Sequence, residues 1–337
     1  MKKTLSAAVA LSIFAAPAIA ANLENPLYMP KQGMGYSKTS AGVMYKIADD
    51  SNAHQKKNHD GATEFPIWRV HEELGYGILD NLEAYAKFGY THDGDIDRKG
   101  MHLGRAGLKY RAIDTTDGWV WDLYADAQLG GISEMSGAYT ANGFNYDNYS
   151  NGRWGFHVGT QVGKTWSKFS TAGFVEVLRT FGNDNNSIDI SGYPLPAPLT
   201  LDMLGMPSEI SVDLKSTTEI NAGLKMFYQM DDRWSFGGGL TYKHHSDNGV
   251  EGLASELNAN APMASVAPTV VNQLLAVVED MEDGFDEYVL NLTAAYQMTD
   301  AMQVAVYGEY TFDEAHAQSQ NGTDVKAELG VRLNVQF

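Results

Sequence analysis

The sequence of 337 residues contains no cysteine, which excludes disulfide bonds, thiolate metal sites and a cysteine nucleophile. Basic residues are few: 24 lysines and arginines stand against 42 aspartates and glutamates, and the net charge is -18. That sign argues against a nucleic-acid-binding protein. Long apolar runs are also missing, because no segment after residue 21 approaches the roughly 18 apolar residues typical of a transmembrane helix. The chain is nevertheless 44% hydrophobic and 11% aromatic, a composition that excludes disorder.

The N-terminus has the pattern of a targeting segment. Lys2 and Lys3 provide a positive start, an apolar run extends from Leu5 to Ala16, and residues 18–20 match an A-x-A cleavage site. The run is shorter than the roughly 20 residues that span a bilayer. We therefore predict a cleaved signal peptide over residues 1–20, and hence an exported protein.

After this segment, apolar residues recur at every second position. The clearest case is the end of the chain, where apolar side chains occupy Val325, Ala327, Leu329, Val331, Leu333, Val335 and Phe337. A period of two gives a β-strand one apolar and one polar face. The pattern predicts twelve strands, although ten or fourteen also remain compatible with it. They lie near residues 36–48, 65–78, 82–92, 100–112, 118–131, 152–164, 168–182, 209–229, 233–246, 285–298, 301–313 and 323–337.

The connections between these strands alternate in length. Those after even-numbered strands are short, whereas those after odd-numbered strands are long, among them residues 49–64, 132–151, 183–208 and 247–284. A soluble β-sandwich shares the alternating strands, but this parity places all tight turns at one end. The layout is typical of a membrane β-barrel with short periplasmic turns and long extracellular loops. The expected strands also exceed the roughly 5–6 residues that are usual in globular proteins.

The predicted fold class is therefore all-β: a transmembrane antiparallel β-barrel of about 12 strands over residues 36–337. Residues 21–35 are expected to form an N-terminal periplasmic segment, which either hangs as a tail or threads into the lumen. In the extracellular loop 247–284, apolar residues at helical spacing after Pro268 predict a short helix. This helix either covers the barrel mouth or folds inward.

These features resemble the Gram-negative outer-membrane β-barrel proteins, among them the porins. In that family a C-terminal phenylalanine with apolar residues at alternate positions before it is the signal for barrel assembly, and Phe337 matches this pattern. The resemblance implies a location in the cell outer membrane. It implies outer-membrane lipids, lipopolysaccharide and the barrel-assembly machinery as partners. We expect no cofactor and no metal, because the histidines lack the spacing of metal ligands.

Charged residues on the expected inner face are the candidate pore-lining set. They are Arg69, Lys87, Arg105, Lys109, Asp122, Asp126, Arg153 and Arg332. In one interpretation these charges neutralise one another and fill the barrel, which then serves as a structural or adhesive protein. In the other they surround water and create a transverse field that governs passage. Barrels of about eight strands are filled and those of 16–18 are open, so twelve strands favour a narrow porin-like channel for passive diffusion of small hydrophilic solutes.

One constellation points to a different class of function. His244 and Ser246 are two residues apart and share a strand face, which the register directs toward lipid. The stretch resembles the H-x-S-N runs of outer-membrane phospholipase A and of lipid A deacylase, but Asp247 interrupts the match. Asp286 is the candidate for orienting the imidazole, as a serine hydrolase requires. The alternative function is therefore an outer-membrane lipid hydrolase.

Overall fold

The computed structural model describes residues 22–47, 67–93, 98–130, 135–136, 153–189, 209–246, 250–251, 285–313 and 325–337. The signal peptide predicted over residues 1–20 and the helix predicted within 247–284 lie outside these ranges. Within the described part of the chain, no helix is long and apolar enough to cross a bilayer.

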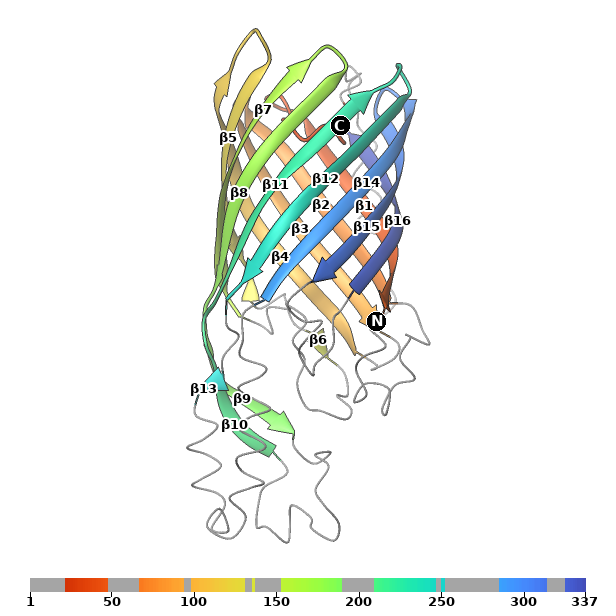
Figure 1. Cartoon of the computed structure of the whole chain (residues 1–337). Helices are drawn as coiled ribbons and strands as arrows, with labels where there is room; N and C mark the ends of the chain where they lie inside the picture. The colour runs from red at the N-terminus through yellow and green to blue at the C-terminus, as the bar shows by residue number, and fades with distance from the viewer. Residues whose placement is uncertain are drawn as a thin grey trace, which may run out of the picture.

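Twelve antiparallel strands form a closed barrel (Figure 1). They are β1 (Gly35–Ile47), β2 (Ile67–Leu79), β3 (Leu82–Asp93), β4 (Arg98–Asp114), β5 (Trp119–Gln128), β7 (Gly155–Trp166), β8 (Phe169–Thr180), β11 (Thr217–Gln229), β12 (Trp234–His245), β14 (Phe285–Thr299), β15 (Met302–Asp313) and β16 (Val325–Gln336). Each strand pairs with its sequence neighbours in the barrel, and β1 pairs with β16 to close the ring. The predicted all-β barrel of about 12 strands is confirmed.

Alternation along each strand separates a lipid-type exterior from a polar interior. On β5, Trp119, Trp121 and Leu123 point outward and are exposed, whereas Asp122 and Asp126 point inward and are buried. The exterior continues in this way around the ring, and Leu329 and Leu292 are exposed by 65% and 60%. Such a largely apolar surface is unfavourable in water and suits the hydrocarbon of a bilayer. Polar side chains also occur on it: Glu72 of β2 accepts hydrogen bonds from Ser37 and Thr39 of β1. A closed ring also leaves no strand edge unpaired in that medium.

Short connections lie at one end of the barrel, called the turn end below, and long ones at the other, the loop end. The turns follow β2, β4, β7, β11 and β14, as predicted. Trp119, Trp166 and Trp234 are exposed on the outer surface beside these turns. Amphipathic rings at this level are typical of the aromatic belt of a membrane protein.

One predicted strand, residues 209–229, is wrong as a single element. It is divided into β10 (Glu209–Leu214) and β11, because the carbonyl of Lys215 accepts a hydrogen bond from Arg153 and Ser216 Oγ accepts one from a backbone N–H. β10 therefore leaves the barrel and pairs with β9 (Asn183–Asp189) and β13 (Val250–Glu251). This small sheet projects from the loop end (Figure 1), and β6 (Met135–Ser136) pairs with β4.

Inward aromatic rings lie against glycines on the adjacent strand. Tyr124 is paired in register with Gly159, and a Cβ added there would overlap the tyrosine ring. The same arrangement recurs at other strand pairs connected through the loop end: Tyr36 with Gly75, Phe174 with Gly223 and Tyr307 with Gly330. Because only glycine leaves room for a ring flat against the wall, these pairs fix the strand register.

Candidate functional site

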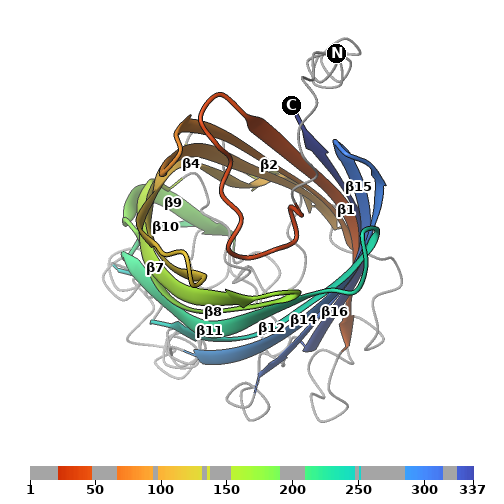
Figure 2. The same cartoon turned by 90° about the horizontal axis from the view of Figure 1, so that it is seen from above.

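The residues that precede β1 fold into the barrel lumen at the turn end. Residues 22–34, called the N-terminal segment below, cross the interior of the ring when the barrel is viewed along its axis (Figure 2). Two Asx turns shape this segment: Asn22 Oδ1 accepts the N–H of Glu24 at 3.0 Å, and Asn25 Oδ1 accepts that of Leu27 at 3.0 Å. Such turns satisfy backbone groups locally, which suits a short coil enclosed by strands.

Glu24 ties the N-terminal segment to β16. Its carboxylate accepts hydrogen bonds from Arg332 Nη1 at 3.0 and 3.1 Å and from Asn334 Nδ2 at 2.8 Å. The Glu24 side chain is 7% exposed and that of Arg332 is 27% exposed. Asn22 donates a further bond to Gln229 on β11 at 2.8 Å. The beginning of the segment is thus held by two separate parts of the wall.

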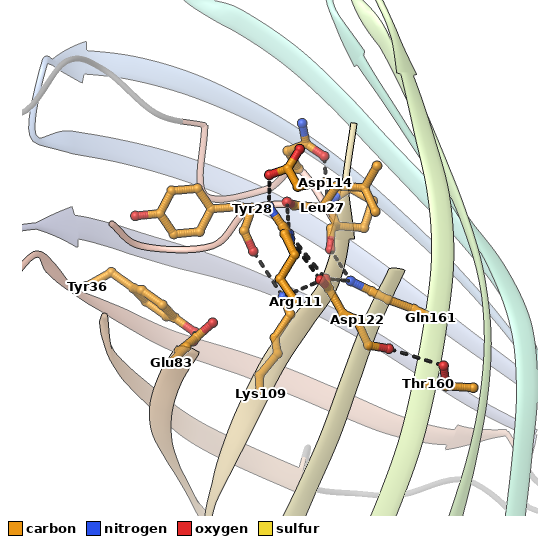
Figure 3. A network of polar contacts seen from close by, with 12 residues as sticks. Leu27, Tyr28, Tyr36, Glu83, Lys109, Arg111, Asp114, Asp122, Thr160 and Gln161 are labelled. Carbon is orange, nitrogen blue, oxygen red and sulfur yellow. Dashed lines mark hydrogen bonds and ion pairs between the residues drawn. The ribbon is translucent and has the colours of Figure 1, made fainter. Parts of the chain in front are cut away.

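Cations on β4 hold the middle of the N-terminal segment. Lys109 Nζ donates to the carbonyl of Tyr28 at 3.0 Å, and Arg111 Nη2 donates to that of Leu27 at 2.7 Å (Figure 3). The Leu27 side chain is 5% exposed and packs in a small apolar cluster with one residue each from β5 and β8. Contacts to β4, β8, β11 and β16 therefore fix the segment across the width of the lumen.

Asp122 organises the wall beneath this contact. Its side chain is fully buried, with Arg111 Nε at 2.8 Å and Lys109 Nζ at 3.4 Å from its oxygens. Gln161 Nε2 donates to Asp122 Oδ2 at 2.9 Å and also to a carbonyl of the N-terminal segment (Figure 3). Burial of a carboxylate requires such pairing. The same cations thereby bind both Asp122 and the segment.

The eight candidate pore-lining residues occupy the inner face of the barrel or the chain just before β7. They are Arg69 on β2, Lys87 on β3, Arg105 and Lys109 on β4, Asp122 and Asp126 on β5, Arg153, and Arg332 on β16. Among the described residues, only Lys109 and Asp122 of this set form an ion pair with each other. Arg105 has no hydrogen bond or ion pair to any described residue.

Several other members pair with residues outside this set of eight. Arg69 lies 3.4 Å from Glu328, and Lys87 lies 3.4 Å from Glu73. Arg153 Nη1 donates to a backbone carbonyl before β11 at 3.0 Å. The alternation of polar and apolar residues shows which side chains face inward, but it does not show which residues of two paired strands lie opposite each other. The ion-pair partners of the pore-lining residues can therefore be identified only from the pairing register that the structure gives.

A buried histidine links two lumen carboxylates. His157 Nδ1 lies 2.7 Å from Asp126 Oδ2, and Nε2 lies 3.3 Å from Glu176 Oε2. Tyr85 donates to Asp126 at 2.7 Å and Tyr124 donates to Glu176 at 3.0 Å. Both carboxylates are therefore hydrogen-bonded to other residues of the barrel wall. The only signal for this cluster in the sequence is that His157 falls at an inward-facing position of its predicted strand.

Charges of opposite sign dominate opposite sides of the lumen. On β1–β4 cations outnumber the acids Glu73 and Glu83; they are Lys38, Arg69, Lys87, Arg105, Lys109 and Arg111. From β5 to β14 acids outnumber the cations Lys225 and Lys243; they are Asp122, Asp126, Glu176, Glu219 and Glu287. Because these strand groups face each other in the closed ring, a field runs across the lumen.

The candidate hydrolase residues lie on the outer surface near the loop end. His244 Nδ1 is 2.8 Å from Asp286 Oδ1, so the structure brings these two residues together as expected. Tyr242 donates to the same carboxylate at 2.9 Å. Ser246 Oγ instead accepts the N–H of Thr218 at 2.8 Å, and no described contact joins it to His244. The predicted histidine and aspartate are therefore in contact, whereas the serine oxygen accepts a hydrogen bond from another residue.

Solved structures of outer-membrane proteins resemble the barrel. An outer-membrane channel from Pseudomonas putida F1 matches with a TM-score of 0.57 at 13% identity, over 94% of this chain and 99% of that chain. The NanC porin matches with a TM-score of 0.43 at 10% identity, over 89% and 98% of the two chains. No protein-family model and no curated protein matches the sequence. The first likeness confirms the predicted outer-membrane barrel at the level of the fold.

Proposed function

We propose that this barrel is a narrow channel of the outer membrane for passive diffusion of small hydrophilic solutes. The observation that carries the proposal is the interior, whose wall is polar and charged around its full circumference. Arg69, Lys87, Arg105, Lys109, Asp122, Asp126, Arg153 and Arg332 contribute to this wall. Several of these side chains retain exposure to the lumen, and that of Lys87 is 42% exposed. A polar surface of this kind attracts water and ions.

The N-terminal segment makes the channel narrow at the turn end. It crosses the lumen and is anchored at Glu24 on one side and at Leu27 and Tyr28 on the other. Solutes must pass beside it, so we expect small solutes to be admitted and large ones excluded. We expect a barrel that lacks this segment to form a wider channel.

The surroundings of the barrel follow from the same proposal. Its apolar exterior contacts outer-membrane lipids, and lipopolysaccharide surrounds the loop end. Phe337 supplies the C-terminal signal that the barrel-assembly machinery binds. Its backbone exchanges two hydrogen bonds with Gly35 at 2.7 and 3.0 Å, beside the start of β1. The assembly signal therefore belongs to the strand pair that closes the ring.

Liposome swelling tests the proposal. Vesicles that contain the refolded mature protein are diluted into solutions of glycerol, arabinose, sucrose and raffinose. We expect rapid swelling with glycerol and arabinose and slow or no swelling with raffinose. Equal impermeability to all four solutes, with a barrel that remains folded by its resistance to heat in detergent, would rule out the channel.

A lipid hydrolase is the second candidate, favoured by the 2.8 Å contact between His244 and Asp286 on the outer surface. For this activity the Ser246 hydroxyl, whose oxygen accepts the Thr218 N–H, must also donate a hydrogen bond to the imidazole of His244. Hydrolysis of phospholipid by the refolded protein, lost in Ser246→Ala and in His244→Ala, would support it. No hydrolysis, or hydrolysis that Ser246→Ala leaves unchanged, would dismiss it.

A further inference from the structure

Arg105 is a lumen-facing cation for which no hydrogen bond to a described residue is found. It lies on the inner face of β4, opposite Lys87 of β3 in the register. Among the described residues it has no hydrogen bond or ion pair, and its Nε atom is buried. A buried donor without an acceptor is costly. Such a donor is tolerated where water or a passing ligand supplies the missing acceptor.

Lys225 is a second lumen cation without a carboxylate partner among the described residues. It faces inward from β11, and its Nζ lies 4.3 Å from the centre of the Phe174 ring. Lys87 is only partly compensated, because it shares Glu73 with Lys38 at 3.4 and 3.5 Å. One carboxylate thus serves two ammonium groups. Of Lys87, Arg105 and Lys225, only Lys87 forms an ion pair with a described carboxylate.

Lys87 and Arg105 lie directly opposite each other in the register of β3 and β4, and Lys225 of β11 interacts with Lys87. Lys87 interacts electrostatically with Arg105 beside it and with Lys225 from the other side of the ring. Proximity of like charges raises the energy of the empty site. Asp126 and Glu176 offset part of this cost, because they interact electrostatically with the same cations. Neither forms an ion pair with Lys87, Arg105 or Lys225 among the described residues, and both are hydrogen-bonded within the wall instead.

We propose that Lys87, Arg105 and Lys225 form a binding site for the carboxylate group of small organic anions on their way through the lumen. The inference rests on the proposed channel and specifies a solute class for it. The guanidinium of Arg105 presents parallel donors that match the two oxygens of a carboxylate, and the two ammonium groups neutralise its charge. The rings of Tyr85 and Phe174 lie beneath the ammonium groups of Lys87 and Lys225 and help to hold these groups in place.

Block of ion current tests the site in the complete mature protein. Benzoate is added to channels that conduct KCl, and inorganic phosphate is the comparison anion. We expect benzoate to reduce the current at millimolar concentration, and Arg105→Gln and Lys225→Gln each to raise the half-blocking concentration by about tenfold, as loss of one charge-assisted hydrogen bond implies. Lys168→Gln, which removes a cation from an exposed turn, is the matched control and should leave the block unchanged.

The outcomes separate the site from the channel. Equal block of the wild type and the two variants, or block by phosphate but not by benzoate, would overturn the carboxylate site while the channel stands. Saturation-transfer difference NMR with benzoate and the refolded protein measures binding without any current. A benzoate signal that Arg105→Gln abolishes supports the site even in a barrel that does not conduct. Absence of the signal in the wild type overturns it.

Discussion

Replacing Glu24 by glutamine should release the N-terminal segment from β16. The substitution keeps the shape of the side chain but removes the negative charge of the carboxylate, which accepts three hydrogen bonds from Arg332 and Asn334. Loss of one partner of a buried ion pair costs about 3–5 kcal/mol. Here Arg332 is 27% exposed and keeps its contact with the Tyr307 ring, 5.0 Å from the centre. We therefore expect about 2 kcal/mol, or about a 30-fold increase in the displaced fraction of the segment.

The absence of cysteine makes this fraction measurable. Met29→Cys places a single thiol in the N-terminal segment at a position that is 9% exposed. Maleimide reacts with this thiol only when the segment is displaced, so the reaction rate reports the displaced fraction. The comparison is between Met29→Cys alone and Met29→Cys with Glu24→Gln, which share any effect of the probe.

We expect the second protein to react about 30-fold faster. Asp232→Asn, which removes an acid from an exposed turn at the same end, should leave the rate unchanged. Equal rates with and without Glu24→Gln would refute the view that this ion pair holds the segment in the lumen. A similar acceleration by Asp232→Asn would show that net charge, not the contact, governs it.

Three further predictions concern the stability of the barrel, measured as thermal unfolding in detergent. Gly159→Ala should destabilise by about 1–3 kcal/mol, because its Cβ displaces the Tyr124 ring; an unchanged transition would contradict the register argument. Asp122→Asn should cost about 3–5 kcal/mol, since it leaves two lumen cations without their buried carboxylate. Asp231 accepts N–H bonds from Trp234 and its neighbour, which lower the pKa of its carboxyl. Stability from this group is therefore fully present above the unfolded pKa of about 4 and is lost progressively as the pH falls through the lower folded pKa, so Asp231→Ala should lower the unfolding temperature at pH 7 and lower it by less as the pH is reduced below about 4.

The barrel itself could be predicted because its determinants are local. A period of two identifies strands and their faces, and the parity of connection lengths assigns the ends. The break at Lys215 could not be read in the same way. The alternating pattern continues through residues 209–229, and the hydrogen bonds at the break come from residues far away in the sequence: Arg153 donates to the Lys215 carbonyl and Gly182 N–H donates to Ser216.

The N-terminal segment shows where sequence reasoning ends. Asn22 and Asn25 are signals for Asx turns, and they could have indicated a compact coil. Its place in the lumen depends on partners from strands throughout the chain, such as Lys109 and Arg332, which meet only when β1 closes on β16. The contact of His244 with Asp286, by contrast, could be predicted, because β12 and β14 are successive strands of the barrel and their outward faces alternate in register.

Single-channel conductance in a planar bilayer tests the central claim, a water-filled path that the N-terminal segment narrows. The complete mature chain and a chain that lacks residues 22–33 are recorded in the same KCl solution. The account predicts small, steady current steps for the complete chain and clearly larger steps for the shortened one. No steps from either folded barrel would contradict the channel, and equal steps from both would contradict the role given to the N-terminal segment.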